Sequence, residues 1–551
     1  MKKLTLLAAA LFSITVLRAQ WVNDPQGNTL IAYTSGDAGE ILLSTDEVSG
    51  DTYMQWCAMA SNGWSVFLQR LNVEGVPQWG DDGIRIEEQS FNAFSEGTSM
   101  TATTNQAVVS CFANTSGECI AIMLDAEGVF KWGKQGISVF DFPSGRSCSR
   151  TEVLAGNGGG VWVLASDNHD TYLRFIDANG YLDQPTVISD TEKNCVHGKL
   201  LRRSGNSVFV VYEKELSSSP NTIEKELWVT GYNQNGISVS PAAQLMSTQT
   251  YDGTYSHEAL SDGLGGGYAF IPHSDANNAF NTYVFHFNFE GVSTINDLGG
   301  IPVHSDDPDN LYVNANGTVH PLSHDLILAY CQTDALTQEE NKLCVNRINA
   351  TGERVWDDGI MIENEPLLKP ETIKVDAFEI GNGFAVTYSF GRYENDNSNI
   401  IAQGLDVSGS MLWNTDLSED LYQRNLCKVS SGFHFDQDII VWAKVGENKI
   451  YGQNIQPDGN MGNTFASAPC SSPGNFTGEP YYDEASQSTG VKLYWTEPDE
   501  QPDHYNLYLW LAGSSTPYVT QIDGGETTHF ERIDDEVTVL CQDRKSTRLN
   551  S

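Results

Sequence analysis

The stretch Met123-Leu-Asp-Ala-Glu-Gly128-Val-Phe-Lys-Trp132-Gly-Lys-Gln-Gly136-Ile-Ser-Val139 contains the pattern that decides the fold. Alternating polar and apolar residues lead into Asp-x-x-Gly, and a Trp with a further Gly follows. An Asp or Asn tolerates turn geometry and the Gly supplies a positive φ, so the pattern predicts a tight hairpin between two strands.

The same pattern returns about every 55 residues along the chain, a spacing in the range of propeller-type repeats. Weaker copies have turn glycines at positions 180, 236, 291 and 459. The four clear copies contain Gly75 with Trp79, Gly128 with Trp132, Gly352 with Trp356, and Gly409 with Trp413.

Each repeat divides into four strand-length pieces, as in the first one, where we expect strands at 40–44, 52–56, 65–71 and 78–86. Four antiparallel strands, repeated radially, form a blade of a β-propeller, and a blade buries its faces only against its neighbours. We therefore predict an all-β fold with about eight blades over residues 21–466. Seven blades plus an irregular repeat is the open alternative.

Two further expectations follow from this arrangement. The segment 27–32 precedes the first repeat and is a candidate strand for the last blade, which would close the ring and remove its open edges. The Trp residues occupy the same phase of each repeat. We interpret them as packing residues between blades rather than as a carbohydrate platform.

The first twenty residues have the pattern of a secretory signal peptide. Lys2 and Lys3 precede an apolar stretch over 4–17 that is too short to span a bilayer. We place cleavage after Ala19 or Gln20 and expect a secreted or outer cell-surface protein. No later stretch reaches about 18 consecutive apolar residues, so we expect no membrane span.

The overall charge limits the classes of partner that the chain can bind. Asp plus Glu number 72 against 31 Lys plus Arg, a formal charge of -41 in 551 residues. Binding to nucleic acid or to an anionic membrane requires clustered basic residues, so both are excluded as partners. An extracellular protein or glycan remains as the expected ligand, of unknown identity.

Ten cysteines in an exported chain can form disulfides. Two pairs occupy the same place in their repeats, the hairpin between the second and third strands. We predict the cross-strand disulfides Cys111–Cys119 and Cys331–Cys344. Zinc binding is disfavoured because no His lies near either pair at ligand spacing.

A linker rich in small residues and proline begins at 467, and the composition changes beyond it. Trp495 with Pro498, the run 505–508 and a closing strand near Phe530 resemble a fibronectin type III domain. The resemblance implies an incomplete β-sandwich over 467–543, because its last strand is missing. We interpret the basic end, 544–551, as a non-native tail and expect the native C-terminus to lie beyond it.

Signal peptide, propeller and type III-like module together resemble the surface proteins exported by Bacteroidetes-type bacteria. The resemblance implies type IX secretion, although no sorting domain is visible. This expectation rests on the missing C-terminus as well as on the resemblance.

A search for catalytic motifs finds no reactive cluster. His257-Glu258 lacks the second His of a zinc-protease motif. We expect no cofactor, although the acidic clusters at 306–310 and 167–170 contain oxygen ligands that suit Ca²⁺. Solvated turn carboxylates are the other interpretation of these clusters.

The sequence therefore favours a binding scaffold without catalytic activity that recognises a protein or glycan through one propeller face. It does not decide between this hypothesis and an enzyme. The alternative is a glycosidase or lyase with a carboxylate pair in the propeller channel. A third hypothesis makes the chain the accessory part of a larger, truncated enzyme.

Overall fold

The structure of the chain is a computed structural model. Residues 1–20 and 543–551 lie outside the described part, and with them the predicted signal peptide and the C-terminal tail. The structure describes residues 21–462 except 37, 47–48, 61–62, 87–96, 220–221, 252–254, 275–279, 296–297, 306, 308, 338–340, 364–369, 379–382, 391–398, 420–422, 431–436 and 445, and beyond 462 only strands between 474 and 542.

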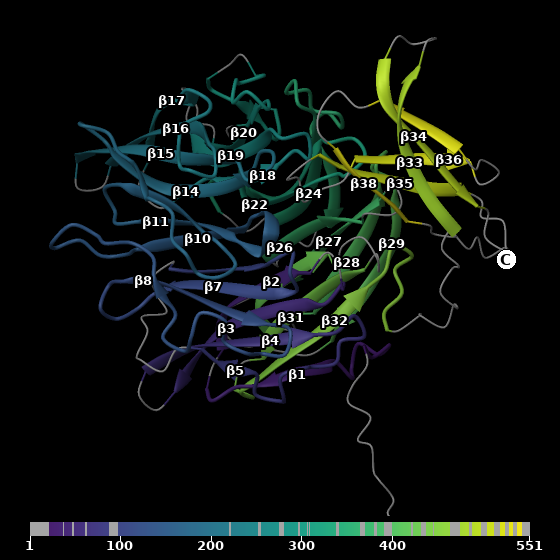
Figure 1. The fold of residues 1–551 in the computed structure, drawn as a ribbon, viewed down its shortest axis with the longest axis horizontal. Coiled ribbons are helices and arrows are strands. Elements are labelled where there is room, and N and C mark those ends of the chain that lie inside the picture. Colours follow the sequence, from purple (N-terminus) through teal and green to yellow (C-terminus); the bar gives the residue numbers. More distant parts are fainter. Residues whose placement is uncertain are drawn as a thin grey trace, which may run out of the picture.

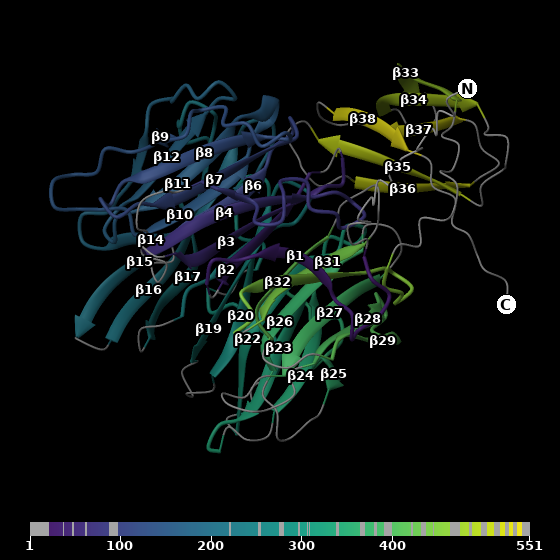
Figure 2. The same cartoon turned by 90° about the horizontal axis from the view of Figure 1, so that it is seen from below.

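Eight four-stranded antiparallel sheets form the blades of a β-propeller (Figures 1 and 2). We number them in chain order: blade 1 is β2–β5, blade 2 is β6–β9, blade 3 is β10–β13 and blade 4 is β14–β17. Blade 5 is β18–β21, blade 6 is β22–β25, blade 7 is β26–β29, and blade 8 is β30–β32 with β1. Eight blades are thus confirmed over the alternative of seven.

Within each blade the chain runs from an inner strand outwards, and the inner strands of adjacent blades contact one another. The inner strands are β2 (Ala38–Thr45), β6 (Thr98–Ala102), β10 (Arg150–Ala155), β14 (Asn194–Arg202), β18 (Glu258–Ser261), β22 (Asn310–Val319), β26 (Pro370–Ala377) and β30 (Gln423–Ser430). The second strands are β3 (Thr52–Ala60), β7 (Ala107–Ala113), β11 (Val161–Ser166), β15 (Val208–Ser219), β19 (Gly267–Ser274), β23 (Leu326–Asp334), β27 (Gly383–Phe390) and β31 (Asp438–Lys444).

The third and outer strands complete each sheet. The third strands are β4 (Gly63–Leu71), β8 (Cys119–Asp125), β12 (Thr171–Ile176), β16 (Thr222–Tyr232), β20 (Phe280–Phe287), β24 (Asn341–Ile348), β28 (Ile400–Asp406) and β32 (Lys449–Ile455). The outer strands are β5 (Ile84–Arg85), β9 (Ile137–Ser138), β13 (Thr186–Ile188), β17 (Ala243–Tyr251), β21 (Ile301–Pro302), β25 (Ile360–Glu363), β29 (Met411–Ser418) and β1 (Thr29–Tyr33). A short 3-10 helix, η1 (Asn157–Gly159), joins β10 to β11.

The ring closes through its first strand. β1 pairs antiparallel with β32, so the start of the propeller is the outer strand of blade 8, as 27–32 was expected to be (Figure 1). This pairing removes the exposed edge that the third strand of blade 8 would otherwise present.

Eight hydrophobic clusters hold the blades together, one between each neighbouring pair. Blades 8 and 1, for example, share a cluster that contains Trp56 and Val441, both shielded from solvent. Each sheet therefore buries both of its faces, and the apolar core is a ring of interfaces rather than one central mass.

The Trp of one blade packs on the turn glycine of the next. A Cβ at Gly128 would lie 2.5 Å from Ile84 Cδ1 and 3.2 Å from Trp79 Nε1. The indole N–H of Trp79 also donates to the carbonyl oxygen of Ala126, at 3.0 Å. Equivalent indole bonds join Trp21 to Val73, Trp132 to Ala178 and Trp413 to Pro457. The glycine is required by its φ of +78° and by this close approach.

The outer strand of the first repeat is shorter than the expected 78–86. Leu71 forms an isolated bridge with Pro77, and regular pairing resumes only at β5. Pro lacks an N–H and two glycines with positive φ, Gly80 and Gly83, turn the chain, so the ladder cannot form continuously. The repeat pattern located the edge of the blade but overestimated its length.

The register places the two cysteines of the predicted pair Cys331–Cys344 in neighbouring rungs of the ladder, and their disulfide stays a prediction. Cys331 lies opposite Leu343 and Cys344 opposite Tyr330, so neighbouring pairs point to opposite faces of the sheet. Cys331 belongs to the core between blades 6 and 7, whereas Cys344 belongs to the core between blades 5 and 6.

The C-terminal strands form two three-stranded sheets, β33-β34-β37 and β36-β35-β38. The strands are β33 (Gly474–Asp483), β34 (Ser488–Thr496), β35 (His504–Leu511), β36 (Tyr518–Asp523), β37 (Thr528–Arg532) and β38 (Val537–Gln542). The fibronectin type III resemblance of this segment stays a prediction. Among the described residues, no helix has the length and apolar character needed to cross a membrane.

Candidate functional site

A group of charged side chains gathers where the inner strands of blades 3, 4 and 5 begin. We call it the charged cluster. Its members come from β10, β14, β15, β16 and the start of β18, and Glu213, Lys225 and His257 are buried. The charged cluster consists of Arg150, Glu152, His197, Lys199, Glu213, Glu215, Lys225, His257 and Glu258.

Glu213 forms the base of the charged cluster and is fully buried. The backbone N–H and ring Nδ1 of His257 both lie 2.9 Å from Glu213 Oε1. Burial alone would raise the pKa of Glu213, but the bond from His257 and the charge of Lys225 lower it below its ordinary value. Glu213 is therefore a carboxylate at neutral pH in spite of its burial.

The Lys225 ammonium is surrounded by three oxygen atoms of the protein. Its Nζ lies 2.8 Å from Glu213 Oε2, 3.0 Å from Glu215 Oε1 and 2.6 Å from the carbonyl oxygen of Tyr255. Burial opposes the charge, but the two carboxylates raise the pKa of Lys225 above its ordinary value. The ammonium is thus held charged and fixed between two strands.

His197 lies at a β-bulge, where the pairing of β14 with β15 shifts between Val196 and Lys199. Its φ is +53°, a left-handed conformation that non-glycine residues seldom adopt. The next residue is Gly198, where a Cβ would lie 2.6 Å from Leu164 Cδ2 of blade 3. The bulge therefore depends on the glycine at position 198. It also changes the direction of the His197 side chain, which is 30% exposed.

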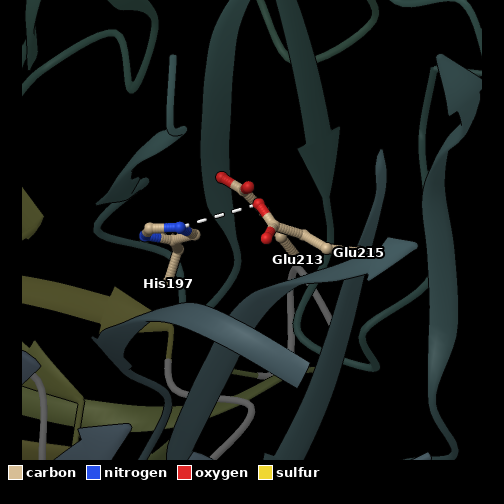
Figure 3. A group of neighbouring side chains, drawn as sticks. All are labelled: His197, Glu213 and Glu215. Carbon is tan, nitrogen blue, oxygen red and sulfur yellow. Dashed lines mark ion pairs between the residues drawn. The ribbon is translucent and has the colours of Figure 1, made fainter. Parts of the chain in front are cut away.

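The imidazole of His197 is neutral at neutral pH. Burial lowers its pKa to about 4. Its Nδ1 accepts a hydrogen bond from the Arg150 guanidinium, so the neutral ring has its proton on Nε2. Nε2 lies 3.6 Å from Glu215 Oε1. A dashed line marks this contact in Figure 3, and it becomes an ion pair only in acid.

The rim of the charged cluster faces solvent. Lys199 Nζ lies 3.0 Å from Glu258 Oε2 of blade 5 and 3.5 Å from Glu152 Oε1 of blade 3. The side chain of Glu258 is 53% exposed and that of Glu152 is 30% exposed. One ammonium therefore holds two accessible carboxylates from different blades in fixed positions.

The same bulge occurs in the inner strands of blades 1 and 6. The register shifts between Gly39 and Leu42 and between Val313 and Asn316, and the bulged residues Glu40 and Asn314 have φ values of +49° and +54°. Three inner strands thus place a polar residue in a left-handed conformation at the same phase. Such outliers gather at functional sites, because an unfavourable backbone persists only where it is supported.

The charged cluster contains a possible set of metal ligands but already has its own cation. Ligand atoms of His197, Glu213 and Glu215 lie within 4.8 Å of one another (Figure 3). Lys225 bonds both carboxylates and supplies the positive charge that a metal ion would bring. These residues are therefore arranged around an ammonium rather than around an open coordination site.

The acidic turns that suit Ca²⁺ by composition are satisfied by protein donors. Both carboxylates of the 167–170 turn bond Arg146, at 3.1 Å from Asp167 Oδ2 and 2.6 Å from Asp170 Oδ2. In the 306–310 cluster, the two oxygens of Asp307 accept bonds from Asp309 N and Asn310 Nδ2. Asp306 lies outside the described residues. These side chains are therefore better described as turn carboxylates than as ligands of an ion.

Two of the expected features now have definite places. The repeat residues Gly75, Gly128, Gly352 and Gly409, with Trp79, Trp132, Trp356 and Trp413, lie at blade interfaces and not in the charged cluster. Cys111 and Cys119 are buried thiols with their sulfur atoms 3.4 Å apart, so their disulfide stays a prediction.

Sequence reasoning missed the charged cluster. One signal was available: Glu213 and Glu215 alternate along the strand soon after the apolar run 208–211. Charges on the buried face of a strand need partners, and Lys225 lies directly opposite Glu215 in the next strand. His257-Glu258, dismissed as a protease motif, belongs to this charged cluster.

No protein-family model and no curated protein sequence matches the chain. Among solved structures, BP39L lectin from Burkholderia pseudomallei is 12% identical with a TM-score of 0.43, over 79% of this chain and 100% of that one. The Dos1 propeller is 12% identical with a TM-score of 0.45, over 78% and 94%. The polysaccharide lyase Uly1 is 11% identical with a TM-score of 0.39, over 81% and 96%.

These solved structures are similar to the chain in fold alone. The chain is an eight-bladed β-propeller protein with a charged cluster at the start of three adjacent inner strands. At such identities and TM-scores, the neighbours' activities carry no argument for this chain.

Proposed function

We propose that the chain is a non-catalytic, exported binding protein that recognises a protein or glycan through the propeller face containing the charged cluster. The supporting observation is the division of the charged cluster into a buried base around Glu213 and Lys225 and an exposed rim that contains Glu258. Such a base fixes the rim groups before a ligand arrives, which lowers the entropy cost of binding.

The chemistry of the rim favours a neutral or basic ligand. Glu152 and Glu258 share the single ammonium of Lys199, so the accessible groups are mainly acceptors. The formal charge of -41 repels polyanions at long range. Hydroxyl groups of a neutral glycan or amines of a basic protein segment match these acceptors.

Binding can be tested with arrays of neutral, acidic and basic glycans and peptides. We expect neutral or basic probes to bind, and Glu258→Gln to weaken binding at least tenfold by removing an exposed charged acceptor. Glu118→Gln, an exposed change in the turn before β8 of blade 2, is the control. Binding only of polyanions, or equal binding by both variants, would contradict the proposal.

A carbohydrate-active enzyme is the second candidate, and one observation favours it. Glu152 and Glu258 come from different blades, and because both contact Lys199 Nζ their oxygens lie no farther apart than the two contact distances combined. Paired carboxylates at about 5–10 Å are typical of glycosidases. Burial alone would raise the pKa of Glu258, but the charge of Lys199 between the two carboxylates lowers it, which opposes the use of Glu258 as a general acid.

Product analysis separates the two candidates. Incubation with neutral and uronic-acid polysaccharides, followed by chromatography of the oligosaccharides, should show no release for a binding protein. Release that is abolished by both Glu152→Gln and Glu258→Gln would establish the enzyme instead.

A further inference from the structure

Three buried cysteines meet at the interface between blades 2 and 3. Cys111 lies in β7 and Cys119 in β8, while Cys148 lies in the connection that leads to β10. All three belong to the hydrophobic cluster shared by the two blades. We call these residues the thiol cluster.

Cys119 is the central member of the thiol cluster. Its sulfur lies 3.4 Å from that of Cys111. The side chain of Cys148 is within hydrogen-bonding reach of Cys119 as well, and burial together with both neighbouring thiols raises the pKa of Cys119 well above its ordinary value. A single sulfur therefore has two potential disulfide partners.

The backbone fixes Cys148 beside the start of β8. Its N–H donates to the carbonyl oxygen of Gly117, at 2.9 Å. A Cβ at Gly117 would lie only 2.4 Å from Ser147 Cβ, so the two segments are in direct contact. Because these contacts involve main-chain atoms, Cys148 stays near Cys119 without any sulfur–sulfur bond.

The register makes Cys111 an imperfect partner for Cys119. Cys111 lies opposite Ala121, and Cys119 opposite Ala113, so the two cysteines form a diagonal pair on one face of the sheet. Diagonal neighbours in a ladder are more widely separated than directly opposite residues, whereas a disulfide needs Cβ atoms about 3.5–4.5 Å apart. Cys148 is not restricted by this ladder.

We propose that Cys111, Cys119 and Cys148 form one oxidation site that holds a single disulfide, in which Cys119 is always one partner and Cys111 or Cys148 is the other. Two thiols transfer two electrons and two protons to a disulfide-bearing oxidant, which leaves as two thiols. The third cysteine of the thiol cluster remains a thiol beside the new bond.

The remaining thiol makes the disulfide exchangeable. Once deprotonated, the third thiol attacks the sulfur of Cys119 and displaces the previous partner, which leaves as a thiolate and takes up a proton. The bond Cys111–Cys119 stays within blade 2, whereas Cys119–Cys148 ties blade 2 to the connection into blade 3. Exchange therefore moves a covalent link from within a blade to a blade interface.

Peptide mapping tests the site directly in the purified full-length chain. After equilibration with oxidised glutathione, thiols are alkylated with N-ethylmaleimide in acid, and proteolytic peptides are identified by mass spectrometry without reduction. We expect one disulfide per molecule in the thiol cluster, containing Cys119, and an alkylated third cysteine. Alkylated Cys119, or Cys119 linked to a cysteine outside the thiol cluster, would overturn the proposal.

Single substitutions test the exchange. Cys111→Ala should give the Cys119–Cys148 bond, and Cys148→Ala the Cys111–Cys119 bond, each in more than half of the molecules. Cys195→Ala, a buried cysteine in the separate core between blades 3 and 4, should leave the wild-type map unchanged. If only one of the two variants retains a disulfide, Cys119 has one fixed partner and the shared site is wrong.

The wild-type map decides the case if a variant fails to fold. It should contain both linked peptides, and their ratio should shift when the oxidised protein is incubated with catalytic reduced glutathione. A map with one linked peptide whose yield never changes would contradict exchange.

Discussion

Two buried lysines, Lys225 in the third strand of blade 4 and Lys428 in the inner strand of blade 8, have different surroundings. Lys428 Nζ lies 2.7 Å from Asp438 Oδ2 and 2.6 Å from the carbonyl oxygen of Ala385 in blade 7, and both side chains are almost completely shielded. Lys225 is equally buried, but one of its two carboxylates, Glu215, also lies 3.6 Å from His197, whose side chain is 30% exposed.

The difference separates a structural ion pair from a candidate recognition site. The ion pair in blade 8 is enclosed by the protein. It therefore links two blades but offers no group that a ligand can contact. The charged cluster in blade 4 extends from a closed base to solvent. Burial of charge alone therefore does not indicate function; continuity with an accessible surface does.

The largest expected effect is that of Lys225→Met. The substitution leaves Glu213 and Glu215 buried without their common cation, and the loss of one partner of a buried ion pair costs about 3–5 kcal/mol. Chemical denaturation at neutral pH should show this loss. Lys199→Met, at the rim, is the matched control and should cost less than half as much; equal losses would remove the distinction between base and rim.

A paired substitution sharpens the comparison. Lys428→Met alone should cost about 3 kcal/mol, and Lys428→Met with Asp438→Leu should recover most of it, because no buried charge then remains. Lys225→Met with Glu213→Leu should not recover, since Glu215 and His257 lose partners as well. Equal recovery in both blades would show that the charged cluster is two independent pairs.

Acid should weaken the charged cluster through His197. Its folded pKa of about 4 lies below the ordinary value of 6.5, so the unfolded chain binds the extra proton first. The stabilisation is complete above pH 6.5 and is lost as the pH falls from 6.5 towards 4, by about 2 kcal/mol for this partly buried ring. Urea titrations of the wild type and His197→Gln should converge in acid; parallel pH profiles would refute this assignment.

The smallest effect concerns the backbone of the bulges. Asn314 is exposed and has a φ of +54°, so Asn314→Gly should stabilise the protein or leave it unchanged, within about 1 kcal/mol. Asn314→Val should destabilise it by about 1–2 kcal/mol, because a branched side chain resists the left-handed conformation. Thermal unfolding of both variants measures the difference, and a loss on Asn314→Gly larger than on Asn314→Val would exclude backbone strain at this bulge.

The fold was accessible from the sequence because its signals are local and repeated. The turn glycines at 75, 128, 352 and 409 each require a positive φ, and their spacing, together with that of the weaker copies, predicted about eight blades and left seven as an alternative. The closing strand β1 was recognised because a propeller with an unpaired edge is a liability. The length of β5 could not be predicted, because the point at which a ladder is interrupted depends on which backbone N–H groups find partners.

The charged cluster was not accessible because its residues come from five strands of three blades. No local pattern joins Arg150 to His197 or Lys199 to Glu258; only the packing of inner strands does. The placement of Cys331 and Cys344 in separate cores was not accessible for the same reason, because a register shift of one residue moves a side chain to the other face.

The most direct test of the recognition site is a calorimetric titration of the strongest neutral or basic array probe into wild type, Glu258→Gln and Glu118→Gln. We expect Glu258→Gln to raise the Kd at least tenfold and Glu118→Gln to leave it within twofold. Equal Kd values for all three proteins would show that the ligand binds elsewhere and that the charged cluster is, like the Lys428–Asp438 pair, purely structural.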